Sequence, residues 1–200
     1  SVVITTGVDY RKLPTKGIAE FTGAGIYYGA AMTEATACRD KEVYIVGGGN
    51  SAGQAAMYLS KFARNVYILV RKEDLTSTMS AYLIAQIKDT PNIHLKPKTE
   101  IVEARGSDKL EQLVLTQVDT HEREEVQADA LYIFIGAKPF TDWIALNIIK
   151  DEKGFIETGR ELKNYQHFNK IWKQQRDPYL LETSCPGIFA AGDVRANAMN

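Results

Sequence analysis

The chain has 200 residues, of which 44% are hydrophobic and 24% charged, and its formal net charge is −1. This composition is typical of a globular protein with a buried core, and the near-neutral charge argues against nucleic acid or an anionic membrane as a partner. No apolar run approaches the roughly 20 residues of a membrane-spanning helix. The first residues, SVVITTG, lack the features of a signal peptide. The sequence therefore favours a cytoplasmic location.

The first half of the chain predicts a βαβ unit. Residues 1–7 are expected to form a buried strand, and a polar connector follows it to about Gly25. Strand, helix and parallel strand are then expected within about 30 residues, which is the length of a βαβ unit. The expected ranges are strands over 42–48 and 65–70, helices over 51–63 and 77–88, and a third parallel strand over 94–96.

The second half predicts a different arrangement. Three strand-like runs without intervening helices indicate an antiparallel β-meander, and an apolar strand then returns to the parallel sheet. The runs are 100–105, 110–119 and 124–127, and the returning strand is 130–135. Together these elements predict an α/β fold, a Rossmann-like nucleotide-binding domain with an antiparallel meander. The chain begins within an apolar strand, so we expect it to be part of a longer protein.

A glycine-rich loop follows the strand over 42–48. Its spacing is G-x-G-x-x-A, with Gly47, Gly49 and Ala52 at the defined positions. The first glycine permits a tight turn and the second a close approach to a pyrophosphate, while the small third residue lets the helix pack near the strand. A strand before the loop and a helix after it strengthen the match. We therefore expect the pyrophosphate to bind at Gly47, Gly48, Gly49, Asn50, Ser51 and Ala52.

The end of the second strand predicts which dinucleotide binds. NAD sites have an acidic residue there, whereas this chain has Arg71 and Lys72. Two cations suit the 2′-phosphate of NADP(H). The acidic pair Glu73-Asp74 follows directly, so a solvated pair of charges stays the alternative.

Five stretches, taken in chain order, resemble the pyridine-nucleotide domain of the thioredoxin reductase group of FAD/NAD(P)-dependent flavoprotein oxidoreductases. They are VVITTG (Val2–Gly7), KEVYIVGGGNSAGQAAMYL (Lys41–Leu59), VYILVRK (Val66–Lys72), YIFIGAKP (Tyr132–Pro139) and PGIFAAGDV (Pro186–Val194). The resemblance implies an NADPH-dependent enzyme that passes hydride to FAD, with FAD bound only in the full-length protein. Ile135 and Gly136 would then line the NADPH site, and Thr6, Gly7, Gly192 and Asp193 would form part of the FAD site.

The resemblance also implies a domain division. Residues 1–25 would be a partial FAD segment, 26–139 the NADPH-binding domain, and 140–200 a second partial FAD segment with an insertion at about 159–182. The insertion is rich in aromatic and cationic residues. Two interpretations stay open for it, a docking face for a partner and a surface loop packed by its own aromatics.

The chain departs from the thioredoxin reductase pattern at the redox cysteines. Gly29 and Met32 occupy the positions of the Cys-x-x-Cys motif, and a dithiol requires two thiols for exchange. The chain has two cysteines, Cys38 and Cys185, which we expect to be buried apolar residues rather than redox or metal-binding groups. Thioredoxin reductase activity is therefore not expected, and the chain alone is expected to be inactive.

No catalytic or metal-ligating cluster is evident in the sequence. Two alternatives stay open, an electron-transfer reductase of the ferredoxin–NADP type and a non-enzymatic nucleotide or redox sensor. The electron acceptor would be a protein or a small molecule, and a homodimer or a fused regulatory domain would be compatible with either alternative.

Overall fold

The computed structural model describes residues 1–29 and 35–198. The chain folds as two compact units, of which unit 1 comprises Ser1–Arg11 and Gly136–Asn200 and unit 2 comprises Lys12–Ile135. Each unit has buried apolar clusters of its own. The domains expected from the sequence are defined by cofactor binding rather than by chain contacts, and they stay a prediction.

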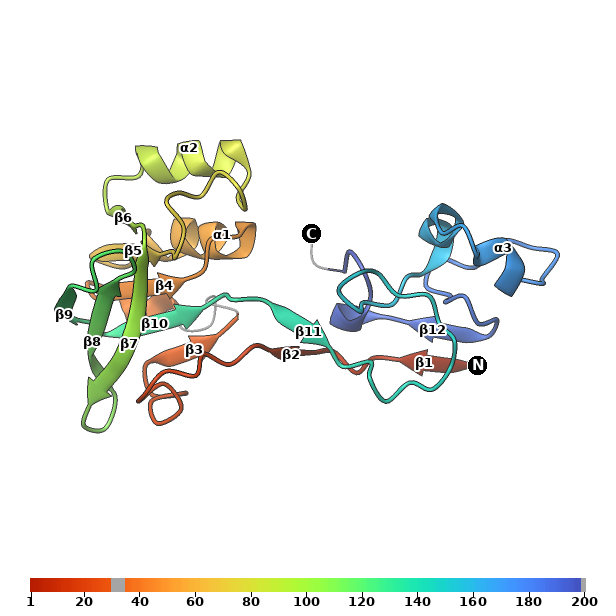
Figure 1. Ribbon diagram of the computed structural model, residues 1–200, viewed down its shortest axis with the longest axis horizontal. Helices are drawn as coiled ribbons and strands as arrows, with labels where there is room; N and C mark the ends of the chain where they lie inside the picture. Colours follow the sequence, from red (N-terminus) through yellow and green to blue (C-terminus); the bar gives the residue numbers. More distant parts are fainter. Residues whose placement is uncertain (30–34, 199–200) are drawn as a thin grey trace. The chain divides into compact units, whose positions relative to one another are not determined.

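Unit 2 is built on a five-stranded parallel sheet (Figure 1). Its strands lie in the order β3 (Ile26–Tyr28), β10 (Ala130–Ile133), β4 (Glu42–Val46), β5 (Asn65–Leu69) and β6 (Ile93–Lys96). Every neighbouring pair is parallel. The predicted βαβ unit and the returning strand are confirmed. β3 has no counterpart among the predicted elements, because three residues are too few to show a period.

Two helices, α1 (Asn50–Leu59) and α2 (Ala81–Asp89), share a core with one face of this sheet. Small buried residues let α1 pack closely against β4 and β5, and a short 3-10 helix, η1 (Ala35–Cys38), packs beside it. α2 begins at Ala81 rather than at residue 77, because Leu75–Ser80 forms a separate turn in front of the helix.

An antiparallel meander covers the other face of the parallel sheet. Its strands are β7 (Thr99–Gly106), β8 (Leu110–Gln117) and β9 (Arg123–Gln127), paired in that order. Buried leucines of β8 pack against Tyr44, Leu69 and Leu131 of the sheet. The predicted meander is confirmed, and unit 2 is therefore a three-layer arrangement of helices, parallel sheet and antiparallel sheet.

Unit 1 contains two pairs of short strands. β1 (Val2–Ile4) pairs with β12 (Ile188–Ala190) in parallel, and β2 (Val8–Tyr10) pairs with β11 (Ala137–Pro139) in antiparallel orientation. The remaining elements are the 3-10 helices η2 (Gly159–Asn164) and η3 (Gly192–Val194) and the single-turn α3 (Phe168–Ile171). β1 is shorter than the expected strand over 1–7, since only residues 2–4 pair with β12. The expected burial is also wrong for Val2 and Val3, which are both 59% exposed, whereas Ile4 is buried. Within the described ranges, no helix is long and apolar enough to cross a membrane.

Candidate nucleotide-binding site

The loop after β4 begins with a glycine that the fold itself requires. Gly47 has φ +143°, a conformation that side-chain-bearing residues rarely adopt. A Cβ at this position would lie 2.4 Å from the carbonyl oxygen of Phe134. The amide of Gly47 donates to the carbonyl of Leu69, 3.2 Å away, which fixes the turn against β5. The predicted role of Gly47 in a tight turn agrees with this geometry.

Gly49 is in a different situation. It is the N-cap of α1 with φ −91° and ψ 175°, an extended conformation open to any residue. A Cβ built at Gly49 would have no described atom within 4 Å. The packing of the chain therefore gives no reason for a glycine here, and the backbone beside the start of α1 is accessible to a ligand. The first turn of α1 contains no acidic residue and, in the described structure, has no side-chain cap. Such a helix terminus favours an anion.

The next three residues have unequal roles. Ser51 is exposed at the start of α1, whereas Ala52 is fully buried beneath it. Asn50 is exposed, but its side-chain Oδ1 accepts a hydrogen bond from the backbone amide of Ser80 at 2.8 Å. The side chain of Asn50 thus contacts the segment that precedes α2, and only its backbone amide belongs to the N-terminus of α1.

Gly53 also marks a close contact that the motif does not identify. A Cβ at Gly53 would lie 2.6 Å from Leu83 Cδ2 and 2.8 Å from Met79 Cε. A side chain at Gly53 would therefore require the ends of the Leu83 and Met79 side chains to shift, and glycine lets both pack directly on α1. The G-x-G-x-x-A pattern assigns the small helix residue to Ala52, and only the position of α2 reveals the role of Gly53.

The two cations lie at the same edge of the sheet as the glycine loop. Val46 and Leu69 are register partners at the ends of β4 and β5, so the residues after each strand emerge side by side. The side chain of Arg71 is 81% exposed, and its Nε lies 3.8 Å from Glu100 Oε1. Lys72 Nζ donates to Ser77 Oγ at 2.9 Å. Arg71 is therefore largely exposed at the strand end, and Lys72 is held there by a neutral partner.

The residues after β10 approach the same edge from the other side. Ile133 is the register partner of Val46, so Phe134 and Ile135 follow the third strand that ends there. Ile135 is partly buried against the core of unit 2. Gly136 has φ +95° and accepts a hydrogen bond from the amide of Arg11 within unit 1.

In unit 1 the structure brings together the two predicted FAD segments. Because β1 and β12 are parallel, Thr6-Gly7 and Gly192-Asp193 follow strand ends at one edge. Gly7 and Gly192 have φ +68° and +73°, and a Cβ at either would have no described atom within 4 Å. Thr6 Oγ1 donates to the carbonyl of Phe140 at 2.8 Å, and Asp193 is exposed.

The family described as "Pyridine nucleotide-disulphide oxidoreductase" matches residues 1–200. The chain belongs to this family. A thioredoxin reductase of Treponema pallidum is 31% identical over 198 residues, which cover 99% of this chain and 57% of the relative. The thioredoxin reductase of Bacillus subtilis is 30% identical over 202 residues, covering 100% of the chain and 56% of the relative. The chain thus spans somewhat more than half of each.

Solved structures give the same result. The thioredoxin reductase of Streptococcus pyogenes matches with a TM-score of 0.79 at 28% identity, covering 100% of this chain and 58% of that one. The Lactococcus lactis enzyme in its FR conformation matches with a TM-score of 0.75 at 28% identity, covering 100% and 59%. The predicted family and the predicted α/β fold class are confirmed. The comparisons show that the chain is related to oxidoreductases of the thioredoxin reductase type.

The two cysteines of this oxidoreductase-family chain, Cys38 and Cys185, are far apart in the sequence and differ in burial. Cys38 is 2% exposed, and its Sγ lies 3.2 Å from the hydroxyl oxygen of Tyr132. Cys185 is only half-buried, so the expectation that both are buried is wrong for Cys185, which lies in a surface turn before β12. Burial still raises the pKa of the Cys185 thiol. Of the positions that replace the Cys-x-x-Cys motif, Gly29 is described, with φ +79°, and Met32 lies outside the described residues.

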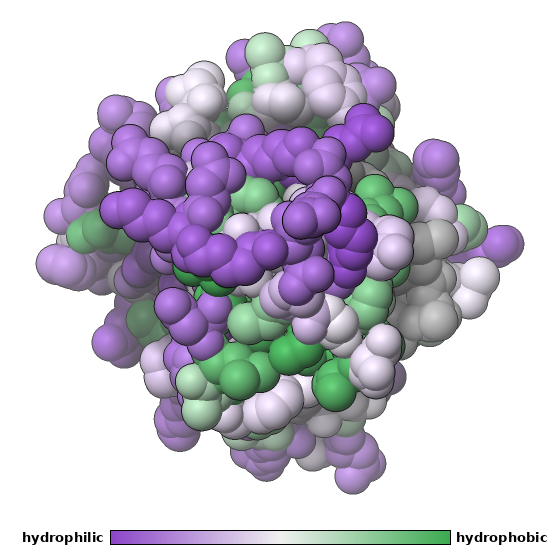
Figure 2. Space-filling view, turned by 90° about the vertical axis from the view of Figure 1, so that its right-hand side faces the viewer, coloured by the Kyte–Doolittle hydropathy of each residue, from purple (hydrophilic) through white to green (hydrophobic). Residues whose placement is uncertain are grey.

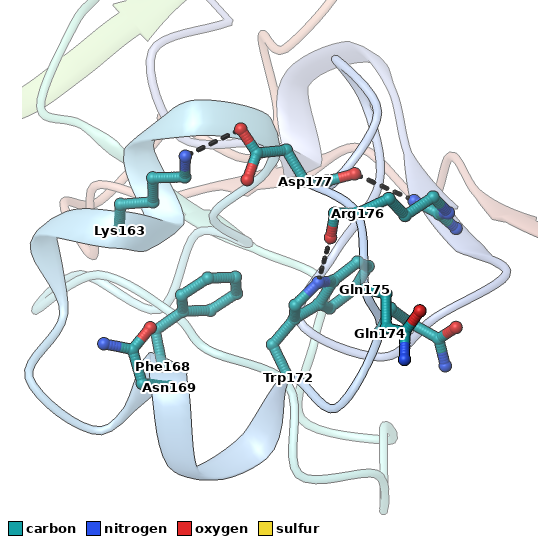
Figure 3. A pocket seen from close by; sticks show the side chains of 8 residues that line it. All are labelled: Lys163, Phe168, Asn169, Trp172, Gln174, Gln175, Arg176 and Asp177. Carbon is teal, nitrogen blue, oxygen red and sulfur yellow. Dashed lines mark hydrogen bonds and ion pairs between the residues drawn. The ribbon is translucent and has the colours of Figure 1, made fainter.

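The segment 159–182 contains an open depression of about 810 Å³ (Figure 3). Its lining residues are Lys163, Phe168, Asn169, Trp172, Gln174, Gln175, Arg176 and Asp177. The rings of Phe168 and Trp172 stack with centroids 5.8 Å apart and pack with Ile149. Both cations of the lining are paired with carboxylates, Lys163 with Asp177 and Arg176 with Glu182. These contacts fit a surface loop packed by its own aromatics, and the docking interpretation stays a prediction.

No group of three or more potential metal ligands occurs in the described part of the chain.

Proposed function

We propose that the chain binds NADPH at the edge where β4, β5 and β10 end. The observation that carries the proposal is the open backbone at Gly49, directly before the uncapped N-terminus of α1. A pyrophosphate there would accept hydrogen bonds from the amides of Gly49 to Ala52 and would be stabilised by the helix dipole. The glycine spacing and the surrounding βαβ unit agree with this use of the loop.

The preference for NADPH is supported by the partners of the acidic residues after β5. Glu73 lies 2.9 Å from Lys98 Nζ, so its carboxylate is neutralised by another cation. Asp74 accepts hydrogen bonds from the backbone and the hydroxyl of Thr76, which lower the pKa of Asp74. Each acid thus has a partner at hydrogen-bond distance within the chain, whereas the ion pair of Arg71 with Glu100 is long, at 3.8 Å, and Lys72 has only the neutral Ser77. Arg71 and Lys72 therefore supply the charge that would face a 2′-phosphate.

In the whole protein we propose an NADPH-dependent FAD oxidoreductase. NADPH would supply a hydride and FAD would accept it, while the protein binds and orients both. Thr6-Gly7 and Gly192-Asp193 would contribute to the FAD site, since both turns leave backbone open at one edge of the β1–β12 pair. A cytoplasmic location is part of the same proposal, and a homodimer would be compatible with it.

We further propose that electrons leave by a route other than the dithiol of thioredoxin reductases. Gly29 has no thiol, and the sequence has methionine at position 32. Thiol–disulfide exchange requires a thiolate, so neither position can carry it. The final acceptor would be reduced directly or through a part of the protein outside this chain.

Isothermal calorimetry of the chain with NADPH and with NADH tests the proposed site. We expect NADPH to bind at least about 10-fold more tightly, which corresponds to about 1.4 kcal/mol. Equal affinities would contradict the assignment of Arg71 and Lys72. No binding of either nucleotide would contradict the site as a whole. NADPH consumption by the full-length protein with artificial acceptors would distinguish an oxidoreductase from a sensor.

A further inference from the structure

The turn Leu75–Ser80, which leads into α2, contacts the glycine loop at two points. Thr78 Oγ1 donates a hydrogen bond to the carbonyl oxygen of Gly48 at 2.7 Å. The backbone amide of Ser80 donates to Asn50 Oδ1 at 2.8 Å. Each contact joins residues that are 30 positions apart in the sequence. The loop is therefore held by a distant segment as well as by its own neighbours.

This leading turn is itself fixed to the core of unit 2. Leu75 and Met79 are 2% and 5% exposed, and both belong to the cluster that joins the helices to the sheet. The amides of Thr78 and Met79 donate to the carbonyl of Leu75 at 3.1 and 2.9 Å, which closes the turn. The backbone on both sides of Thr78 is thus anchored, and from there its hydroxyl reaches the carbonyl of Gly48.

The hydrogen bond from Thr78 determines how the peptide between Gly48 and Gly49 is oriented. A trans peptide is planar, and its carbonyl and amide point in opposite directions. Fixing the carbonyl of Gly48 toward Thr78 therefore directs the amide of Gly49 to the opposite side. Gly49 is the residue beside which the chain leaves space. Without this bond, the peptide between the two glycines would have more rotational freedom and would lose more entropy when a ligand binds.

We propose that Thr78 is a positioning residue that preorganises the Gly49 amide for the pyrophosphate of the dinucleotide. This inference rests on the proposed NADPH site and adds the residue that sets its geometry. Thr78 acts through the backbone of the glycine loop and does not itself contact the ligand. A purely structural role, in which Thr78 only secures α2, would affect all ligands and the stability of the fold equally.

The test compares Thr78→Val with Thr78→Ser in the full 200-residue chain. Valine has nearly the same shape but no donor, whereas serine retains the hydroxyl. Thr120→Val, which removes an exposed hydroxyl between β8 and β9, is the matched control. NADPH and adenosine 2′-monophosphate are the two probes, because the second carries the 2′-phosphate and no pyrophosphate. Affinities are measured by calorimetry or by chemical-shift titration.

For Thr78→Val we expect about 3- to 10-fold weaker binding of NADPH, the range of one lost neutral hydrogen bond. Binding of adenosine 2′-monophosphate should change less than about twofold, and Thr78→Ser should restore NADPH affinity to within about twofold. Equal loss for both probes, no loss for NADPH, or failure of serine to rescue would each overturn the positioning role. If the unmodified chain binds NADPH normally, such a result leaves the proposed function standing. If the unmodified chain does not bind NADPH, both proposals fail.

Discussion

Gly47 and Gly49 occupy the same loop but are glycines for different reasons. Gly47 has a positive φ and no room for a Cβ, whereas Gly49 has an extended backbone and open space beside it. Gly49→Val should therefore leave the fold nearly intact, because valine tolerates this conformation. It should abolish nucleotide binding, since the branched side chain would fill the space assigned to the pyrophosphate. A thermal-shift titration with NADPH measures both effects.

Gly47→Ala is the informative comparison for that experiment. A Cβ there would approach the Phe134 carbonyl oxygen to 2.4 Å in a strained conformation, so we expect about 1–3 kcal/mol of destabilisation without ligand. If Gly49→Val responded to NADPH as the unmodified chain does, the loop would not be the binding site.

Arg71 offers a test of the 2′-phosphate assignment that does not disturb the fold. Its side chain is 81% exposed and its ion pair with Glu100 is long, so the pair contributes at most about 1 kcal/mol to stability. Arg71→Ala should weaken NADPH binding by about 1–3 kcal/mol, the scale of a hydrogen bond to a charged group, and leave NADH nearly unaffected. Calorimetry with both nucleotides measures the difference.

Arg64→Ala is the matched control for this substitution. Arg64 is also exposed, at 66%, and also forms a long ion pair, 3.9 Å from Glu42. It lies before β5, at the opposite edge of the sheet from Arg71. Equal losses of NADPH affinity in the two variants would indicate a general effect of charge rather than a specific contact.

The motif spacing and the flanking strand and helix point to Gly47 and Gly49 as candidate site residues, and their use by a ligand stays a prediction. The sequence does not reveal all the contacts around this loop. The engagement of Asn50 by Ser80, and the close packing at Gly53, depend on where α2 lies in space. No local pattern encodes a contact between residues 30 positions apart, so these roles appear only in the folded chain.

The same distinction holds for whole elements. β4, α1 and β5 could be predicted because they are long enough to show their periodicity. The meander strands could be predicted because turns rich in charged residues separate them. β2, β3 and β11 have three residues each and exist because a partner strand pairs with them. The sequence predicts too early a start for α2, because Leu75–Ser80 forms a turn that tertiary contacts hold before the helix begins.

The buried carboxylate of Glu182 links the segment 159–182 to the turn before β12. Glu182 is fully buried and accepts hydrogen bonds from the Arg176 guanidinium at 2.6 and 2.8 Å, and from the amides of Tyr179 and Gly187. The guanidinium also lies 4.1 Å from the ring centroid of Tyr179. Glu182 thereby joins the segment to the turn that opens β12.

Replacing Glu182 with glutamine should loosen this connection. The amide keeps the shape but loses the charge-assisted bonds, at a cost of about 1–3 kcal/mol. Amide hydrogen exchange at Tyr179 and Gly187, measured at pH 7, should become faster by about 5- to 150-fold. Glu161→Gln, an exposed glutamate of the same segment that contacts Asn164, should leave both rates unchanged. Unchanged exchange in Glu182→Gln would show that the carboxylate does not secure the segment.

The stability contributed by Glu182 should depend on pH. The Arg176 guanidinium and the two amides lower the pKa of Glu182 to about 2 in the folded chain. The folded state therefore binds fewer protons than the unfolded state, and the stabilisation is complete above the ordinary glutamate pKa of 4.5. It is lost as the pH falls from 4.5 toward 2. The difference in unfolding free energy between the unmodified chain and Glu182→Gln should shrink over this range, and denaturation series at pH 7 and pH 3 measure it. A constant difference would contradict the assignment.

At the scale of the whole molecule, exposed apolar surface is concentrated in unit 1. Eight of the ten large hydrophobic residues that are exposed in the described ranges belong to this unit. They are Val2, Val3, Phe140, Trp143, Leu146, Tyr179, Leu180 and Leu181. Figure 2 shows apolar surface between hydrophilic side chains on the face that carries β1, β12 and α3. Exposed apolar side chains gathered on one surface are a feature of interaction faces.

The chain by itself should bind NADPH but not retain FAD. Thr6-Gly7 and Gly192-Asp193 offer two short backbone segments, which are too few contacts to offset the entropy of fixing so large a ligand. Hydride transfer also requires the two rings to be held about 3–3.5 Å apart. The purified chain should show no flavin absorbance and no NADPH oxidation with ferricyanide, dithiobis-nitrobenzoate or thioredoxin, while calorimetry detects NADPH binding. Stoichiometric FAD that survived purification would show that the exposed turns of unit 1 suffice as a flavin site, and that the proposed division of the cofactor sites is wrong.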